Sequence, residues 1–304
     1  MKNKILFSLL VCLSLISCQD KVNLEIKDQN KNLLVVDAFL TKFDTSGSLF
    51  VRLTESNNYT DTLKSNSGSA FYTFYESPYK LTNPIKSAIV YLESSVGEKI
   101  FFSQDSQYFG WYGVNVKNIK ENESYILKIE AKNKHYESTY QKVNAPVAID
   151  EVSNKDYVYL RKNGYMFNEI LLNQNPDYLV ASFTDPKNEK NYYTWLHFGS
   201  TLDQMKTLSD NDFEDGTKIP FEFLWFNYKI VAQKEFYLYQ VSINANFSQY
   251  ITDLKNIKST NGPFSSPPSN PLNNLRCIED PKEEVLGFFE ISTASRKKFV
   301  YKPQ

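Results

Sequence analysis

An acidic run between Asp210 and Gly216 is the part of the sequence best suited to bind an ion. Its carboxylates belong to Asp210, Asp212, Glu214 and Asp215, and a glycine closes the run. Calcium takes about six to eight oxygen ligands, which acidic residues around a tight glycine turn supply. The spacing misses the EF-hand pattern by one residue at the glycine, and no Glu stands at the closing position. The run therefore predicts either a calcium-binding loop or a solvated hairpin loop, and the sequence indicates no other cofactor.

Two aromatic stretches, Tyr108–Gly113 and Phe221–Tyr228, are the remaining candidates for ligand binding. They contain Trp111, Tyr112 and Trp225. Exposed aromatic side chains stack on sugars or form the anchor points of protein interfaces, whereas buried ones belong to the core. We expect most of these side chains to be core residues. Trp111 stands between glycines in an apparent turn, so we expect its side chain to be the exposed one.

The residue types that usually carry catalysis are scarce and scattered. His135 and His197 fall in different predicted domains, and neither has a Cys, His or paired acid at a ligand-like spacing. Cys277 has no suggestive neighbour, and the sequence contains no G-x-S-x-G, C-x-x-C or Gly-rich phosphate loop. A hydrolase would need a cleft with converging carboxylates, and no pair is singled out. We therefore expect no enzymatic activity.

The first residues have the form of a lipoprotein signal peptide. Lys2 and Lys4 precede an apolar segment, Ile5–Ile16, that is too short for a membrane-spanning helix of about 20 residues. Leu15-Ile16-Ser17-Cys18 resembles a bacterial lipobox, in which the small Ser17 admits the signal peptidase and the Cys18 thiol receives a diacylglycerol. Two or three acyl chains anchor a protein stably in a membrane. We therefore expect residues 1–17 to be removed and Cys18 to carry the lipid anchor.

Charge and cysteine content narrow the class of protein further. The formal net charge is −1, and loss of Lys2 and Lys4 with the signal peptide makes it two units more negative. Without a run of Lys and Arg among aromatics, the sequence does not predict nucleic-acid binding. Cys12 would leave with the signal peptide and Cys18 would be acylated, so Cys277 has no partner for an internal disulfide. The fold must therefore be stabilised by its core.

The elements expected from the sequence are mainly β-strands. Residues 18–32 are polar and predict a tether, and 33–146 predict an immunoglobulin-like β-sandwich. Its strands are expected at Leu33–Leu40, Ser87–Glu93, Ser124–Ala131 and Lys134–Val143, with a hairpin turn at Lys132-Asn133. A long Ser- and Asn-rich loop, Thr54–Lys80, separates the first two of these.

The second half, 147–304, predicts a second β-rich domain with one amphipathic helix. Strands are expected at Met166–Asn173, Asp177–Phe183, Asn191–Gly199 and Glu235–Ile243. Apolar residues at helical spacing predict a helix near 246–258, and Gly262-Pro263 predicts its end. A proline-rich irregular segment and two final strands, "VLGFFEIS" and "KKFVY", complete this domain.

The order of these segments resembles the family catalogued as domain of unknown function 4249. The resemblance rests on the lipobox, on "NYYTW", "DNDFEDG" and "LYQVSINANFSQYITDL", and on "PFSSPPSN" and "LGFFEISTASRKKF". It implies an outer-membrane lipoprotein, frequently encoded beside a TonB-dependent transporter. The stretch "LRCIEDPKEEVLGFFE" is longer and more acidic than the Gly-rich turn that the family usually has there.

These observations lead to a functional expectation with one rival. We expect a non-catalytic accessory subunit of a TonB-dependent β-barrel transporter that captures or presents substrate. The rival is a self-standing surface module that binds glycan or another protein. Gln19 after Cys18 lacks the commonest inner-membrane retention signal, so we expect attachment to the outer membrane, facing the cell surface rather than the periplasm.

Overall fold

The computed structural model describes residues 32–43, 48–56, 80–155, 178–197, 207–209, 216–224, 235–259 and 271–300. The predictions for Cys18, the tether, Trp225, the acidic run 210–215 and the strand at 166–173 lie outside these ranges. Among the described residues, no helix is long and apolar enough to cross a membrane.

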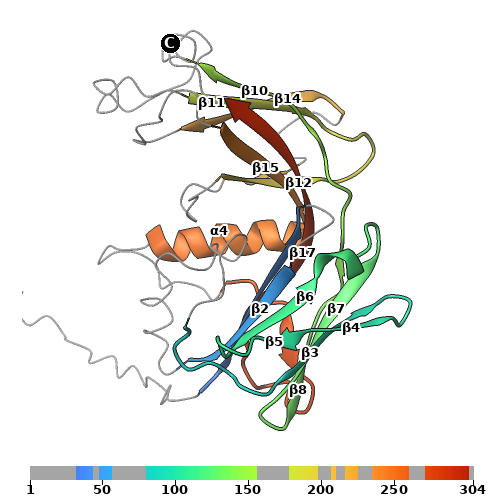
Figure 1. Cartoon of the computed structure of the whole chain (residues 1–304), viewed down its shortest axis with the longest axis vertical. Coiled ribbons are helices and arrows are strands. Elements are labelled where there is room, and N and C mark those ends of the chain that lie inside the picture. Colours follow the sequence, from blue (N-terminus) through green and yellow to red (C-terminus); the bar gives the residue numbers. More distant parts are fainter. Residues whose placement is uncertain are drawn as a thin grey trace, which may run out of the picture. The chain divides into compact units, whose positions relative to one another are not determined.

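The largest sheet joins strands from both ends of the sequence. Its order is β13-β12-β15-β17-β1-β2-β6-β5. The strands are β1 (Leu34–Lys42), β2 (Ser48–Glu55), β5 (Ser103–Gln104), β6 (Trp111–Asn115), β12 (Tyr192–His197), β13 (Thr207–Ser209), β15 (Glu235–Ile243) and β17 (Leu286–Val300). The first half of β17 pairs in parallel with β1, and its second half pairs antiparallel with β15. The first and last described strands, blue and red in Figure 1, therefore lie side by side.

A second sheet packs against β1, β2, β6 and β17 to form the sandwich. Its order is β16-β8-β7-β3-β4, with β9 paired to β7. The strands are β3 (Ile89–Ser94), β4 (Lys99–Phe101), β7 (Ser124–Ala131), β8 (Lys134–Ser138), β9 (Gln141–Lys142) and β16 (Leu275–Cys277), and a 3-10 turn, η2 (Val116–Asn118), follows β6. Alternate residues such as Val36, Leu53, Leu127 and Phe289 point inward and form one continuous core.

Helix α4 (Ala245–Ser259) packs on the other face of the large sheet. Phe247, Tyr250 and Ile251 recur at helical spacing and contact Phe39 and Phe288 of the sheet. This apolar stripe explains both the helix and its place, because a helix of this length is marginal in water without tertiary packing.

A small third sheet, in the order β10-β11-β14, has a core of its own. Its strands are β10 (Ile149–Lys155), β11 (Tyr178–Thr184) and β14 (Lys218–Leu224). Ile149 and Phe183 pack against Tyr193, Trp195 and Leu238 of the large sheet. The three sheets are therefore linked by buried apolar contacts.

The predicted fold class, mainly β with a sandwich and one helix, is confirmed. The hairpin turn at Lys132-Asn133 forms with both residues at positive φ, 56° and 58°. The domain arrangement differs from the expected division at 146, because β16 and β17 complete the two sheets of the N-terminal sandwich and Asn32–Gln304 forms one compact unit. The two expected final strands form one strand, and β16 lies in the segment expected to be irregular.

Candidate functional site

The prediction of an exposed Trp111 is wrong. Its side chain is fully buried in β6, which pairs on both sides, with β2 and with β5. The Phe50 ring packs edge-on at 5.8 Å, and the Arg52 guanidinium lies 5.5 Å from the centre of the indole ring. The neighbouring Gly113 does not mark a turn. It makes room for Phe50, whose ring would lie 2.9 Å from any added Cβ.

Tyr112 is a core residue too. Its hydroxyl donates a hydrogen bond to the carbonyl of Ile85 and accepts one from the N–H of Ala88, both at 3.0 Å. Burial raises the pKa of this phenol. Tyr112 therefore fixes the chain that leads into β3 and is inaccessible to a ligand.

Of the acidic run Asp210–Gly216, the structure describes only the closing glycine, Gly216. The N–H of Gly216 lies 3.4 Å from a carboxylate oxygen of Asp185, a buried side chain whose other oxygen accepts a 2.6 Å hydrogen bond from Tyr193. Among the described residues, no group of three or more His, Cys, Asp or Glu side chains is arranged to hold a metal ion.

His135 and Cys277 meet the same carboxylate group, that of Glu279. The Glu279 carboxylate contacts Nδ1 of His135 and accepts a 2.9 Å bond from its backbone N–H. These bonds lower the pKa of Glu279 to about 2 and raise that of His135. The Cys277 thiol is buried and donates to Glu279 at 3.6 Å. This cluster ties the segment after β16 to β8. His197, in β12, belongs to the other sheet.

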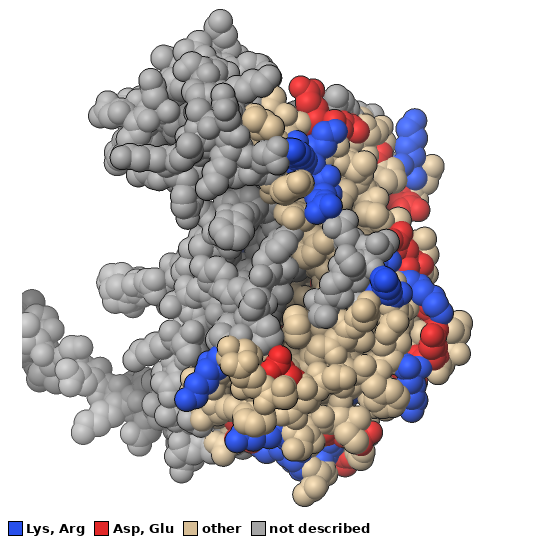
Figure 2. All heavy atoms as spheres, in the orientation of Figure 1, with Lys and Arg blue, Asp and Glu red and all other residues tan. Residues whose placement is uncertain are grey.

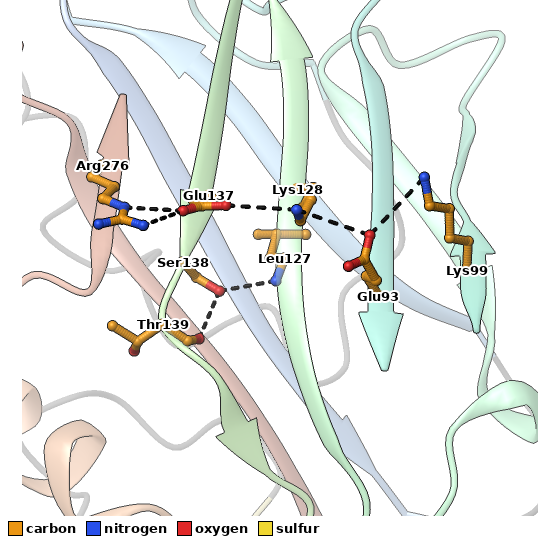
Figure 3. A network of polar contacts seen from close by, with 8 residues as sticks. All are labelled: Glu93, Lys99, Leu127, Lys128, Glu137, Ser138, Thr139 and Arg276. Atoms are coloured by element: carbon orange, nitrogen blue, oxygen red, sulfur yellow. Dashed lines mark hydrogen bonds and ion pairs between the residues drawn. The ribbon is translucent and has the colours of Figure 1, made fainter. Parts of the chain in front are cut away.

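The outer face of the second sheet carries a row of alternating charges that runs across all five of its main strands (Figure 3). We call it the charged row. It consists of Arg276, Glu137, Lys128, Glu93 and Lys99. β16, β8, β7, β3 and β4 each contribute one side chain. Cross-strand register places them in line, since Arg276 and Lys128 both stand opposite Glu137.

The distances between opposite charges lengthen along the charged row, from Arg276 toward Lys99. Glu137 accepts a 3.0 Å bond from Nε of Arg276, and its second oxygen lies 3.6 Å from the Lys128 ammonium. Glu93 contacts Lys128 at 3.9 Å and Lys99 at 4.0 Å. Three cations thus share two anions, and the row ends in a cation at each edge of the sheet. Figure 2 shows charges of both signs interspersed along the right-hand edge of the view.

A pair of aromatic side chains, the partly exposed Tyr91 and the exposed Phe101, adjoins the charged row at β4. The rings of Tyr91 and Phe101 lie 5.2 Å apart, and the Lys99 ammonium lies 5.0 Å from the centre of the Tyr91 ring. Phe101 is 60% exposed. Aromatic and cationic side chains held together on one face of a sheet are suited to binding a macromolecular surface.

Part of this outer face was predictable from the sequence. The alternation of Ser124–Ala131 predicted that Lys128 points outward, as the structure shows. Tyr91 and Phe101 were not singled out, because the register of the β3–β4 hairpin decides that they stand opposite each other. The signal for the pair is the hairpin pattern of "IVYLESSVGEKIF", in which Gly97 marks the turn and Tyr91 and Phe101 stand opposite each other.

Comparison with known proteins gives one result. Residues 19–298 match the family described as Domain of unknown function (DUF4249). The chain belongs to this family. No curated protein is similar enough to be matched with it. Membership of DUF4249 agrees with the resemblance carried by the C-terminal motifs and supplies no reaction or ligand.

Proposed function

We propose that this DUF4249 chain is a non-catalytic, lipid-anchored outer-membrane protein that serves as an accessory subunit of a TonB-dependent nutrient transporter. Family membership and the lipobox at Cys18 support this proposal. The sequence after Cys18 favours the outer membrane, and we place the protein on its cell-surface side. In this role the protein captures substrate or presents it to the β-barrel.

The observation that carries the proposal is the outer face of the second sheet. Five paired strands hold the charged row and the Tyr91–Phe101 pair in fixed register. A sheet face that combines ordered charges with an exposed aromatic side chain favours recognition of another protein, because charge complementarity sets partner choice and aromatic anchors supply affinity.

Co-purification of the lipidated protein tests the proposal. A C-terminal tag allows extraction from native membranes in mild detergent, and the proteins recovered are identified by mass spectrometry. A β-barrel transporter in stoichiometric amount is the expected result. The Cys18→Ser variant is the control, because it must lose both membrane attachment and the barrel. Recovery of the membrane-attached protein without a β-barrel transporter would refute the accessory role.

A surface glycan-binding module is the second candidate, and the exposure of Phe101 beside Tyr91 favours it. Aromatic rings stack on sugar faces. If the isolated protein binds a glycan, Phe101→Ala should weaken binding, while Tyr140→Ala, at a separate exposed aromatic, should not. Binding by the isolated protein without any barrel partner would favour this second function.

Calcium binding by the acidic run is a separate proposal. Asp210, Asp212, Glu214 and Asp215 would supply carboxylate oxygens. Calcium should then raise the melting temperature and EDTA should lower it, with Asp212→Asn abolishing the difference. Equal melting temperatures in calcium and in EDTA would exclude this role.

A further inference from the structure

We propose that the edge of the sandwich formed by β4 and β5 binds an extended segment of a partner protein, apolar in its middle and acidic at both ends. The binding surface is a strip of six side chains: Lys86, Ile89, Tyr91, Lys99, Phe101 and Phe109. We call it the lysine-capped strip. The inference rests on the proposed function only in requiring a protein partner.

The middle of the strip is apolar and unusually exposed. Phe101 is 60% exposed, Ile89 48% and Phe109 44%. Tyr91 joins Ile89 to Phe101, because it stands opposite Phe101 and two residues from Ile89 on the same face of β3. Exposed large apolar side chains that lie together mark an interaction surface, whereas single ones are ordinary.

A lysine closes each end of the strip and lies over an aromatic ring. The Lys99 ammonium lies 5.0 Å from the Tyr91 ring centre, and that of Lys86 lies 4.7 Å from the Phe109 ring centre. Lys86 has no ion pair in the part of the chain that the structure describes. Among the described residues, the only ion pair of Lys99 is with Glu93, at 4.0 Å, and Glu93 is shared with Lys128. The positive charge at each end of the strip is therefore incompletely neutralised by neighbouring carboxylates.

The backbone beneath the strip lies at a sheet edge. Among the described strands, β4 is the last of its sheet and has a partner on one side only. Ile100 stands opposite Leu92, and Phe102 donates its N–H to Val90 at 2.9 Å, so alternate residues bond to β3. The N–H and C=O groups of Lys99 and Phe101 consequently point away from β3. An extended segment adds to such an edge through main-chain bonds, and side chains give specificity.

Charge complementarity defines the segment. β4 is short, so few main-chain bonds are available and the side chains must supply most of the selectivity. Lys99–Gln104 is roughly six residues of extended chain, or about 20 Å. Gln104 accepts a 3.0 Å hydrogen bond from the N–H of Ser87, which brings the neighbouring Lys86 to this end of the strip. The segment that fits carries carboxylates about six positions apart, to meet Lys99 and Lys86, with apolar side chains between them on Ile89 and Phe101.

Site-specific photo-crosslinking in native membranes tests this inference. Benzoylphenylalanine replaces Phe101 in the full-length lipidated protein, and the same substitution at Tyr140, 52% exposed, is the matched control. We expect a discrete adduct from position 101 and not from 140. Sequencing the linked peptide should reveal an extended apolar segment with acidic residues at both ends.

Charge reversal then tests the role of the lysines. Lys86→Glu with Lys99→Glu should reduce the adduct at least about fivefold. Lys117→Glu with Lys282→Glu, two exposed lysines outside the strip, should leave it unchanged. Unchanged melting temperatures verify folding. The inference is overturned if position 101 links no more than 140, if the linked segment lacks carboxylates, or if charge reversal has no effect.

The outcomes separate this inference from the proposed function. If a barrel co-purifies but forms no crosslink at position 101, the inference about the lysine-capped strip is overturned and the accessory role still stands. A charge-dependent adduct at position 101 with a protein other than a transporter supports the strip and overturns the accessory role.

Discussion

One oxygen of Glu290 accepts hydrogen bonds from both the backbone N–H and the side-chain amide of Asn244, at 2.9 and 3.0 Å. Asn244 precedes α4, and its carbonyl accepts the first helical bonds, from Phe247 and Ser248. The contact therefore fixes the start of the helix to the first half of β17, which pairs with β1. The other oxygen of Glu290 is buried and has no hydrogen-bond partner among the described residues. Burial raises the pKa of Glu290 to about 8.

Glu290 should make the stability of the protein fall as pH rises. Between pH 4.5 and about 8 the folded state retains a proton that the unfolded state has released. The free energy of unfolding should therefore decline by up to about 1.4 kcal/mol per pH unit in this window and level off above it. Urea denaturation of the wild type and of Glu290→Gln, from pH 5 to 9, measures the effect. A pH-independent difference between the two proteins would contradict it.

Asn244→Ala should lower the free energy of unfolding by about 1–3 kcal/mol. The substitution removes the side-chain amide that donates to Glu290 and to the carbonyls of Lys142 and Ile291, and leaves Glu290 with one bond fewer in a buried site. Asn246→Ala is the matched control, because Asn246 is exposed in the first turn of α4 and should change stability by less than about 0.5 kcal/mol. Equal effects in denaturation experiments would show that the contact with Glu290 contributes nothing.

The His135–Glu279 pair should stabilise the protein within a limited pH range. The lowered pKa of Glu279 gives stability that is present above pH 4.5 and is lost as pH falls toward 2. The raised pKa of His135 gives stability that is present below pH 6.5 and is lost as pH rises through the raised value. The melting temperature of the wild type should exceed that of Glu279→Gln most between pH 4.5 and 6.5. A constant difference from pH 3 to 9 would refute the pairing.

Gly287→Ala should be severely destabilising, by more than about 3 kcal/mol, because a methyl group there would overlap the carbonyl of Val36 in the paired strand. Gly97→Ala provides the control. Both glycines have positive φ, 103° and 86°, but nothing lies within 4 Å of a Cβ at Gly97. Gly97→Ala should therefore lower the free energy of unfolding only through backbone strain, by about 1–2 kcal/mol. Similar melting temperatures for the two variants would refute close packing at Gly287.

Local patterns in the sequence predicted local structure well. The alternation before Lys132 and the helical spacing around Tyr250 identified the hairpin and α4, because both depend on neighbours along the chain. Long-range pairing was not predictable in this way. β16 is three residues long and is a strand only because Tyr136–Ser138 stands opposite it.

The same distinction explains the error at Trp111. Flanking glycines favour a turn when only adjacent residues are considered. Gly110 does stand in a turn, with a φ of 87° and the Trp111 N–H bonded to the Tyr108 carbonyl at 3.3 Å. The turn ends at Trp111, which begins β6, and a Cβ at Gly110 would lie 2.8 Å from the carbonyl oxygen of Leu53. Only the pairing of β6 with β2 shows that Trp111 lies inside the sheet. Likewise, the charged row exists because five separate strands bring their charges into register.

The parallel pairing of β1 with β17 has a consequence for how the protein is made. β1 is the first described strand to be synthesised and β17 the last, so the central pair of the large sheet cannot form until nearly the whole chain is available. Contacts between residues so distant in sequence slow folding and leave strand edges exposed meanwhile. Folding of the large sheet therefore waits for residues 286–300, and a chain truncated before Leu286 would lack the strand that joins β1 to β15.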